Sequence, residues 1–315
     1  MSLFSIVAAV CFCAASAAPA ASRVHAWGDL QYNYAVGSPI LKGSSVADIA
    51  AGSFHSLVLK KGGSMLAWGD NRFGQTNIPT SLKWKPVAAI AAGNIHNLAL
   101  LRNGSVVAWG PAPGQYGDYG QCTVPADLQR VVAVAAGAVH SLALKRDGIV
   151  VAWGHNLYGQ CDVPVGLDSV VALAGGMYHS LALQNDGTVV AWGNNYMGQT
   201  DVPEGLNNVV AIAAGGLHSL ALRADGTVAI WGGYGLIQAS LPDGLTDVVA
   251  IATGDHHSLA LRSDGTVVAW GFDWTGQCAV PTGLAGVTAI AARGSHSMAL
   301  VREEPLTRLS RQGSR

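Results

Sequence analysis

The sequence predicts an all-β fold: a seven-bladed β-propeller with three main antiparallel strands per blade and room for a short fourth strand. Two repeated elements lead to this prediction. A segment of the type V-V-A-I-A-A-G-G-L-H-S-L-A-L recurs along the chain in seven copies, and a shorter element, A-W-G or I-W-G, also occurs seven times. A fixed period of about 40 residues is typical of folds in which one supersecondary unit packs against the next.

Histidines and tryptophans mark the repeats and indicate how the ends of the chain meet. Successive motif histidines are separated by 41, 44, 39, 39, 39 and 39 residues, and six of the tryptophans follow a histidine by 13 residues. The first tryptophan has no motif histidine before it, and the last histidine has no tryptophan after it. We therefore expect the N-terminal strand, Val24 to Gly28, to complete the last blade, Val287 to Val301, and so to remove an exposed sheet edge. The histidines are His55, His96, His140, His179, His218, His257 and His296, and the tryptophans are Trp27, Trp68, Trp109, Trp153, Trp192, Trp231 and Trp270.

One repeat, Val209 to Gly232, shows the expected strands. V-V-A-I-A-A-G is a short apolar run, G-x-x-H is a tight connection, and H-S-L-A-L-R is a second run. Asp225-Gly226 separates it from a third run, and Asp-Gly between two such runs is a strong hairpin signal. Strict alternation would place Val209 and Val210 on opposite faces of the sheet. Both faces are then apolar, so each sheet must be covered on both sides.

Length and composition limit the domain organisation and the partners. The chain has 315 residues, of which 50% are apolar and 12% charged, and its formal net charge is −1. The continuous repeat favours a single domain over residues 21–303, followed by a C-terminal tail over 304–315. Because the positive charges form no stripe that could neutralise phosphates, a nucleic-acid partner is not expected. We expect a monomer.

The N-terminal segment 1–20 has the pattern of a signal peptide. An apolar centre is followed by two small-residue sites, A-S-A and A-P-A, that suit signal-peptidase cleavage. No Lys or Arg precedes Arg23, so an uncleaved membrane anchor remains the alternative. The expected location is secreted or periplasmic, and no membrane partner is expected after cleavage.

Three cysteines follow this segment, at equivalent positions of different repeats. Each comes after Gly-Gln, where two other copies carry Thr76 and Thr200. Equivalent points on neighbouring sheets are about 10 Å apart or more, which exceeds the roughly 7 Å limit between the Cα atoms of a disulfide. We interpret Cys122, Cys161 and Cys278 as small buried thiols in place of threonine, with a disulfide or metal role as the alternative.

The elements G-x-x-H-S-L-A-L and V-V-A-W-G-x-N-x-x-G-Q resemble the repeats of the regulator of chromosome condensation family, over nearly the whole span from Val24 to Val301. The short period, the Gly-Gln-Thr/Cys-x-Val-Pro segment and the expected export signal are more similar to a secreted bacterial branch that includes a propeller-type β-lactamase inhibitory protein. The resemblance implies a propeller scaffold, while the target depends on variable residues and is not implied. The chain departs from the pattern at Ile237, which replaces a glycine, and in a five-residue insertion within Pro111 to Tyr119.

No residue pattern indicates catalysis, a cofactor or a metal site. The adjacent His and Ser of each H-S pair point to opposite faces of a strand, so they cannot form a nucleophile–base couple. The motif histidines occupy separate blades, whereas a metal needs several ligands around one point. The D-G-T turn has a single carboxylate, which is too few for a calcium loop. We interpret the histidines as structural hydrogen-bonding groups and do not expect an enzyme.

Aromatic residues gather in two loop classes that the strand order places on one face. The G-x-x-H turns and the loops after A-W-G lie at the same end of the strands, which we call the loop face; the Asp-Gly turns lie at the other end, the hairpin face. Tyr and Trp bury large areas at low entropic cost and dominate binding hot spots, so the loop face is predicted to recognise a protein. The predicted protein-binding residues are Phe54, Phe73, Tyr116, Tyr119, Tyr158, Tyr178, Tyr196, Tyr234 and Trp274.

Other interpretations remain open at this point. Residues five positions after a motif tryptophan, such as Phe73 and Tyr158, could instead plug the ends of the blades. The same rings suit stacking on sugars, which would make the protein a carbohydrate-binding or cell-envelope structural propeller. The eukaryotic branch of the family adds a guanine nucleotide exchange or chromatin role, which the missing basic tail disfavours. The favoured function is a secreted propeller that binds another protein, with inhibition of an extracellular or periplasmic enzyme as one use.

Overall fold

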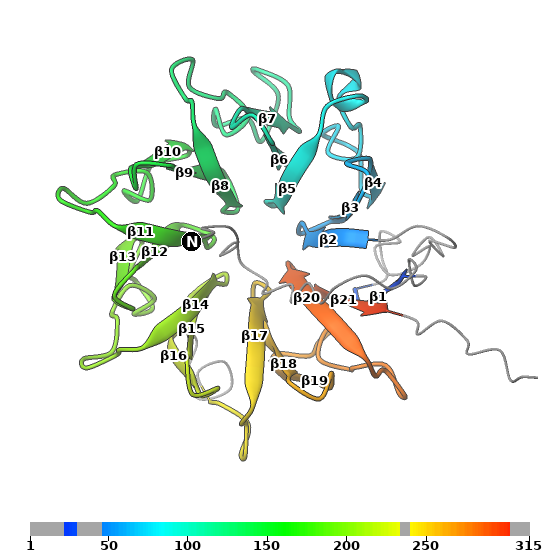
Figure 1. Ribbon diagram of the computed structural model, residues 1–315, viewed down its shortest axis with the longest axis vertical. Helices are drawn as coiled ribbons and strands as arrows, with labels where there is room; N and C mark the ends of the chain where they lie inside the picture. Colours follow the sequence, from blue (N-terminus) through cyan, green and yellow to red (C-terminus); the bar gives the residue numbers. More distant parts are fainter. Residues whose placement is uncertain (1–21, 30–45, 234–239, 303–315) are drawn as a thin grey trace, which may run out of the picture.

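The computed structural model describes residues 22–29, 46–233 and 240–302; the predicted signal segment and C-terminal tail lie outside them. The described strands form seven three-stranded antiparallel sheets, which Figure 1 shows arranged radially around a central axis. The chain is therefore the all-β, seven-bladed propeller that its sequence predicts. No sheet has a fourth strand within the described residues. Their one helical element is the 3-10 turn η1 (Thr80–Leu82), and no helix among them is long and apolar enough to cross a membrane.

Blades 1 to 6 each contain three consecutive strands, and the first strand of each lies nearest the axis in Figure 1. Blade 1 contains β2 (Val46–Ala51), β3 (His55–Lys60) and β4 (Met65–Gly69); blade 2 contains β5 (Val87–Ala92), β6 (Asn97–Leu101) and β7 (Val106–Trp109). Blade 3 contains β8 (Val131–Ala136), β9 (His140–Lys145) and β10 (Val150–Gly154); blade 4 contains β11 (Val170–Gly175), β12 (His179–Gln184) and β13 (Val189–Gly193). Blade 5 contains β14 (Val209–Ala214), β15 (His218–Arg223) and β16 (Val228–Gly232); blade 6 contains β17 (Val248–Thr253), β18 (His257–Arg262) and β19 (Val267–Gly271).

The two ends of the described chain meet in blade 7, as the positions of the tryptophans predict. This blade contains β20 (Val287–Arg293), β21 (His296–Arg302) and β1 (Ser22–Gly28), and β1 pairs with β21 along its whole length in antiparallel register. Trp27 on β1 occupies the place of the other motif tryptophans, and its Nε1 donates to the main-chain oxygen of Gln277, 3.0 Å away. The predicted closure by the N-terminal strand is confirmed.

We call the strand of each blade that lies nearest the axis the inner strand. At its start, the side chains do not alternate strictly between the two faces as expected from sequence. In β14 the pairing with β15 shifts between Val209 and Ala211, so Val210 is an extra residue in the inner strand. Val209 is buried, whereas Val210 is 41% exposed. The same shift occurs in all seven inner strands. The alternation was wrong here because a β-bulge sets two residues opposite one and returns the second to solvent.

The hydrophobic core lies between neighbouring blades. Successive residues of a middle strand face different neighbours: Leu220 packs in one cluster with Trp270 of blade 6, and Ala221 packs in another with Leu181 of blade 4. Both residues of blade 5 are fully buried. The two-sided apolar sheets and the packing of the motif tryptophans between blades therefore agree with the sequence analysis.

Candidate functional site

Buried histidines join each blade to the next one. Nε2 of His179 in blade 4 lies 3.0 Å from Oγ of Ser219 in blade 5. Blade 2 carries asparagine in place of this serine, and Oδ1 of Asn97 lies 2.6 Å from Nε2 of His55. The other pairs are His96–Ser141 (3.1 Å), His140–Ser180 (3.0 Å), His218–Ser258 (2.9 Å), His257–Ser297 (2.8 Å) and His296–Ser56 (3.3 Å). Hydrogen bonds of one kind therefore link all seven blades into a ring.

The direction of proton donation shows that these pairs are structural. Oγ of Ser219 donates its proton to the main-chain oxygen of Gln199, 2.8 Å away, so it accepts from His179. Nε2 of His179 therefore carries the proton and is not free to act as a base, and both side chains are fully buried. The predicted hydrogen-bonding role of the motif histidines is confirmed. Their partner lies in the next blade, which the H-S adjacency did not indicate.

Buried glutamines fix the loops that follow the tryptophans. The main-chain oxygen of Gln160 accepts from Oγ of Ser180 (2.9 Å) and from Nε1 of Trp192 (3.0 Å), both in blade 4. Its side-chain Oε1 accepts from the main-chain nitrogen of Tyr158 at 3.0 Å. Gln160 is fully buried, so it attaches the loop that carries Tyr158 firmly to the next blade. The Gly-Gln motif thus fixes the position of the loops that form the loop face.

Five rings meet on the loop face of blades 2 to 4. We define the aromatic cluster as Tyr119, His155, Tyr158, Tyr178 and Tyr196. Ring centroids are separated by 4.9 Å for Tyr119–His155, 5.7 Å for His155–Tyr178, 5.1 Å for Tyr158–Tyr178 and 6.0 Å for Tyr158–Tyr196. Tyr178 belongs to a G-x-x-H turn, whereas the other four belong to loops after a motif tryptophan. The two loop classes therefore share one face, as the strand order predicts.

His155 is the member of the aromatic cluster that the sequence analysis missed. Because Oε1 of Gln160 accepts a main-chain proton, its Nε2 is the group that donates to Nδ1 of His155, at 2.8 Å. The proton of the neutral imidazole is therefore on Nε2. Burial lowers the pKa of His155, which favours the neutral ring at neutral pH. The signal in the sequence is that only this copy has a histidine directly after W-G.

The predicted binding residues differ in exposure. Five are exposed: Tyr116 (86%), Tyr196 (81%), Trp274 (72%), Tyr119 (49%) and Tyr158 (36%). Three are half-buried: Phe54, Phe73 and Tyr178. Tyr234 lies outside the described residues. Leu157, which the sequence analysis did not select, is 76% exposed beside the aromatic cluster.

The predicted residues form more than one group. Tyr116 pairs with Phe73, with ring centroids 6.4 Å apart, next to the aromatic cluster along the ring of blades. Trp274, in the loop after blade 6, stacks on Phe272 with ring centroids 4.5 Å apart. The ring centroids of His256 and Phe272 are 6.0 Å apart. The aromatic cluster is the largest continuous group among the described residues.

The loop face that carries the aromatic cluster is negatively charged. Among the described residues, the aspartates of the loop face that are exposed or half-buried are Asp29, Asp118, Asp162, Asp201, Asp255 and Asp273. Every lysine in the described part of the chain lies on the hairpin face or in the links that lead to it. Arg72 is the exposed arginine of the loop face there, and its Nη2 lies 2.9 Å from Oδ2 of Asp70. The loop face is therefore acidic as well as aromatic.

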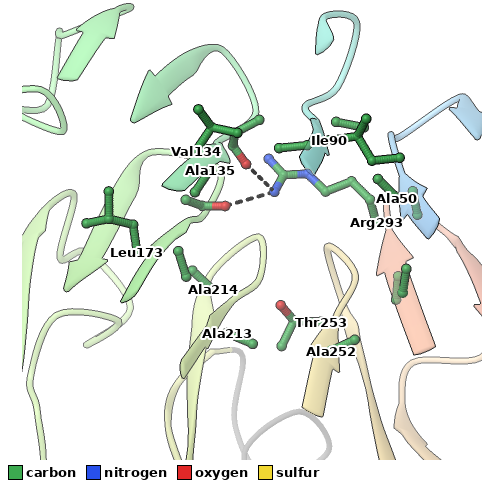
Figure 2. Close-up of a pocket in the computed structure, with 18 of the residues that line it drawn as sticks. Ala50, Ile90, Val134, Ala135, Leu173, Ala213, Ala214, Ala252, Thr253 and Arg293 are labelled. Atoms are coloured by element: carbon green, nitrogen blue, oxygen red, sulfur yellow. Dashed lines mark hydrogen bonds between the residues drawn. The ribbon is translucent and has the colours of Figure 1, made fainter. Parts of the chain in front are cut away.

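Arg293 reaches across the central cavity, which measures about 190 Å³ and is lined mainly by alanines of the inner strands. Figure 2 shows its guanidinium pointing from blade 7 toward main-chain oxygens on the far side. Nη1 donates to the oxygens of Gly175 (2.9 Å) and Ala136 (3.4 Å), and Nε donates to Oδ1 of Asn94 (3.4 Å). Burial lowers the pKa of Arg293, but the side chain remains charged. Its protons are used to tie blade 7 to blades 2, 3 and 4.

The sequence analysis also missed Arg293. The signal is A-A-R-G-S-H in the seventh copy, because the other copies have a glycine three residues before the histidine. A Cβ on the equivalent Gly215 would collide with the imidazole of His218, so the seventh turn has a different shape. Glycine moves one position along, to Gly294, where φ is +55°.

The three cysteines are free, and their side chains are half-buried. We predicted that these side chains are buried, but they are only half-buried. Each lies at the surface, against the main chain of its own loop. Sγ of Cys161 donates to the oxygen of His155 at 3.3 Å, and Sγ of Cys278 donates to that of Phe272 at 3.4 Å. A threonine hydroxyl is also a hydrogen-bond donor, and two other copies carry threonine at this position.

Solved structures share this fold. Prp20p from Saccharomyces cerevisiae has a TM-score of 0.74 and 22% identity, over 90% of this chain and 92% of that chain. Yeast RCC1 (Prp20) bound to Kap60 has a TM-score of 0.76 and 21% identity, over 91% and 90%. Human WBSCR16 has a TM-score of 0.70 and 20% identity, over 90% and 100%. Identities this low establish similarity of fold alone.

Sequence comparison supplies the family. A search of curated proteins found no match. The family model of the regulator of chromosome condensation (RCC1) repeat matches residues 46–75, 87–121, 131–160, 170–199, 209–233 and 248–273, together more than half of the chain. The family predicted from the G-x-x-H-S-L-A-L element is confirmed, while membership of a secreted bacterial branch stays a prediction. The chain belongs to the regulator of chromosome condensation (RCC1) repeat family.

Proposed function

We propose that this protein is a non-enzymatic propeller that binds another protein through its loop face. The aromatic cluster carries this proposal. Tyr158 and Tyr196 expose rings that are held by neighbouring rings and by loops attached to buried glutamines. Rings fixed before binding lose little conformational entropy in the complex, and tyrosine combines a large apolar area with a polar hydroxyl.

The charge around the aromatic cluster favours a partner whose contact surface is basic. Asp162 and Asp201 are exposed next to the loops that carry Tyr158 and Tyr196. Oδ1 of each accepts from an asparagine side chain of the same loop, at 2.7 Å in both cases, so the carboxylates are fixed in place. Complementary charge speeds encounter and disfavours wrong partners, whereas the rings supply most of the affinity.

We also infer that the protein acts outside the cytoplasm, secreted or periplasmic, and that its partner is an enzyme that it inhibits. The support is the sequence of segment 1–20 and the similarity of the repeats to a secreted branch of the family. Prp20p is described with binding properties toward Gsp1p and histones, and in a complex with Kap60. Those partners belong to that protein; they support only the use of such a propeller as a protein-binding scaffold.

Affinity capture tests the proposed function. The mature chain is immobilised and exposed to secreted and envelope fractions, in parallel with the double variant Tyr158→Ala/Tyr196→Ala. Ile149→Ala is the matched control because Ile149 is 50% exposed on the hairpin face. We expect a protein that the parent and the control retain and that the double variant loses, and the purified protein then gives a Kd.

Two outcomes would contradict the proposal. Equal capture by all three chains would place the binding site away from the aromatic cluster. Binding to a glycan array that is lost in Tyr158→Ala/Tyr196→Ala, with no protein retained, would show that the rings stack on sugars and that the protein is a carbohydrate-binding propeller.

A further inference from the structure

A second exposed aromatic site lies on the hairpin face, at the junction of blades 1 and 2. Trp84 is 87% exposed and stands between Lys83 and Lys85. Nζ of Lys83 lies 5.4 Å from the centroid of its ring. This indole belongs neither to the hydrophobic core nor to the aromatic cluster. We define the basic patch as Lys60, Lys61, Lys83, Trp84, Lys85 and Arg102.

The K-W-K segment is a local insertion on a fixed base. The link from blade 1 to blade 2 reads P-T-S-L-K-W-K-P-V, where a later copy reads P-E-G-L-N-N-V, and the histidine spacing rises to 41 from 39. Leu82, just before the insertion, is 3% exposed and packs in the core cluster that contains Val87. The short helix η1 ends at Leu82. Trp84 therefore projects from an anchored turn.

The other cations lie on both sides of this segment. A Cβ built on Gly63, in the turn that follows Lys60 and Lys61, would be 3.7 Å from the main-chain oxygen of Lys85. On the other side, the main-chain nitrogen of Arg102 donates to the oxygen of Pro86 at 2.9 Å. The two hairpin turns and the K-W-K segment thus form one continuous surface.

The hairpin turns that contribute to this surface contain no acidic residue. The hairpin turns of blades 3 to 6 each contain an aspartate. In blade 3, Oδ2 of Asp147 lies 3.6 Å from Nζ of Lys145. The corresponding turns of blades 1 and 2 read K-K-G-G-S and R-N-G-S, without a carboxylate. Among the described residues, the cations of the basic patch form no ion pair. Their charge is therefore available to an outside anion.

We propose that the basic patch binds an anionic phospholipid surface reversibly, with the indole of Trp84 in the headgroup region and the cations against the lipid phosphates. Tryptophan favours the membrane–water interface because it combines an apolar body with one N–H. Lysine and arginine near an anionic leaflet each add attraction, and their stems pack along the apolar region.

The shape of the basic patch favours lipid over nucleic acid. Single-stranded nucleic acids bind along grooves where several aromatic rings stack on successive bases. Within the described residues, Trp84 is the one exposed aromatic ring of the hairpin face. A single projecting ring suits insertion into a soft, flat surface. Binding there would direct the loop face away from the lipid, so that the aromatic cluster stays free for a protein partner.

Vesicle co-sedimentation tests this proposal with the folded chain. The probes are vesicles of phosphatidylcholine alone and of phosphatidylcholine with phosphatidylglycerol, at low salt. We expect binding to the anionic vesicles that added salt reverses. Trp84→Ala should weaken it by about tenfold, for loss of the inserted ring. Lys83→Gln/Lys85→Gln should weaken it by about thirtyfold, for loss of two surface charges.

Trp274→Ala is the matched control, because Trp274 is 72% exposed on the loop face, and it should bind vesicles like the parent. Absence of binding to anionic vesicles, or equal binding to both lipid compositions, would overturn the proposal. So would an unchanged affinity in Trp84→Ala. If polyglutamate binds the parent and the vesicles do not, the partner of the basic patch is an acidic polypeptide. None of these outcomes depends on the protein partner of the loop face.

Discussion

Nε2 of His296 lies 3.3 Å from Oγ of Ser56, and this contact joins the last blade to the first across 240 positions of sequence. The same pair of groups joins the other neighbouring blades, except blades 1 and 2, where asparagine replaces serine, so the closing interface is built like the others. β1 adds the second long-range closure by completing blade 7. A propeller closed in this way leaves no sheet edge open where its two ends meet, so another chain cannot pair there.

Blade 2 offers a direct test of the inter-blade hydrogen bonds. Oδ1 of Asn97 accepts from His55 and its Nδ2 donates to the main-chain oxygen of Gln75, which are the two roles of serine elsewhere. Asn97→Ala should lower the free energy of unfolding by about 1–3 kcal/mol, because the buried Nε2 proton of His55 loses its acceptor. Asn97→Ser should keep most of the stability. Urea denaturation of the two variants decides, and equal losses would contradict the prediction.

The ring of histidines should make the protein sensitive to acid. Burial lowers the pKa of His179 to about 3 and that of His55 to about 4, and it also lowers the pKa of the other motif histidines. In the unfolded chain these groups bind protons below pH of about 6.5. The unfolded state then holds more protons than the folded state, so stability is lost as pH falls from about 6.5 toward 3, by about 1.4 kcal/mol per histidine and pH unit.

Asp48 has the opposite effect, because burial raises its pKa to about 7 and the folded state takes up its proton first. One carboxyl is outweighed by seven imidazoles. A proton on Nδ1 of His140 or His179 would also find no acceptor in the folded protein. Urea midpoints should therefore fall steeply between about pH 7 and pH 5. Midpoints that stay constant over this range would show that the histidines titrate normally in the fold.

The free cysteines should be chemically quiet. Burial raises the pKa of Cys161 and of Cys278 to about 12, so the thiols stay protonated at neutral pH and react slowly. Replacing all three cysteines by threonine should change the free energy of unfolding by less than about 1 kcal/mol, since threonine already fills this position in other repeats. Mass spectrometry after brief alkylation of the native protein checks the reactivity. A mass increase on reduction would reveal a disulfide and contradict the interpretation.

Repetition made the framework predictable from sequence. The absence of a histidine before Trp27 and of a tryptophan after His296 was enough to predict that β1 completes blade 7, since strand complementation follows from counting elements. The bulge at Val210 was not predictable in this way, because two apolar residues in succession fit both regular pairing and a bulge. The partner of His179 was also out of reach: Ser219 is 40 positions away, and only the spacing between blades brings the two together.

The candidate sites were less predictable because they depend on departures from the repeat. The tyrosines stood out by residue type, but His155 joins them through a hydrogen bond from Gln160 that no motif shows. Arg293 occupies a position where the other copies have glycine, and its targets lie on blades far away in sequence. Trp84 belongs to no repeated element, and its exposure depends on how the inserted K-W-K segment leaves the core.

Alanine variants of the loop face separate recognition from plugging. Tyr196 and Trp274 are 81% and 72% exposed, whereas Tyr178 is half-buried and contacts Tyr158 and His155. Tyr196→Ala and Trp274→Ala should change the free energy of unfolding by less than about 0.5 kcal/mol, as exposed side chains do. Tyr178→Ala should cost about 1–2 kcal/mol because it removes ring contacts.

The exposed rings, which should contribute little to folding stability, should contribute strongly to partner binding. Once a partner is captured, Tyr158→Ala and Tyr196→Ala should each weaken it by about 2 kcal/mol or more, because few central residues carry most of the affinity of an interface. If these rings plugged the blades instead, each variant would lose about 3–5 kcal/mol of folding stability, as buried aromatics do. Thermal melts distinguish the two before any partner is known. Large losses at Tyr196, whose ring is mostly in solvent, would be incompatible with a recognition surface.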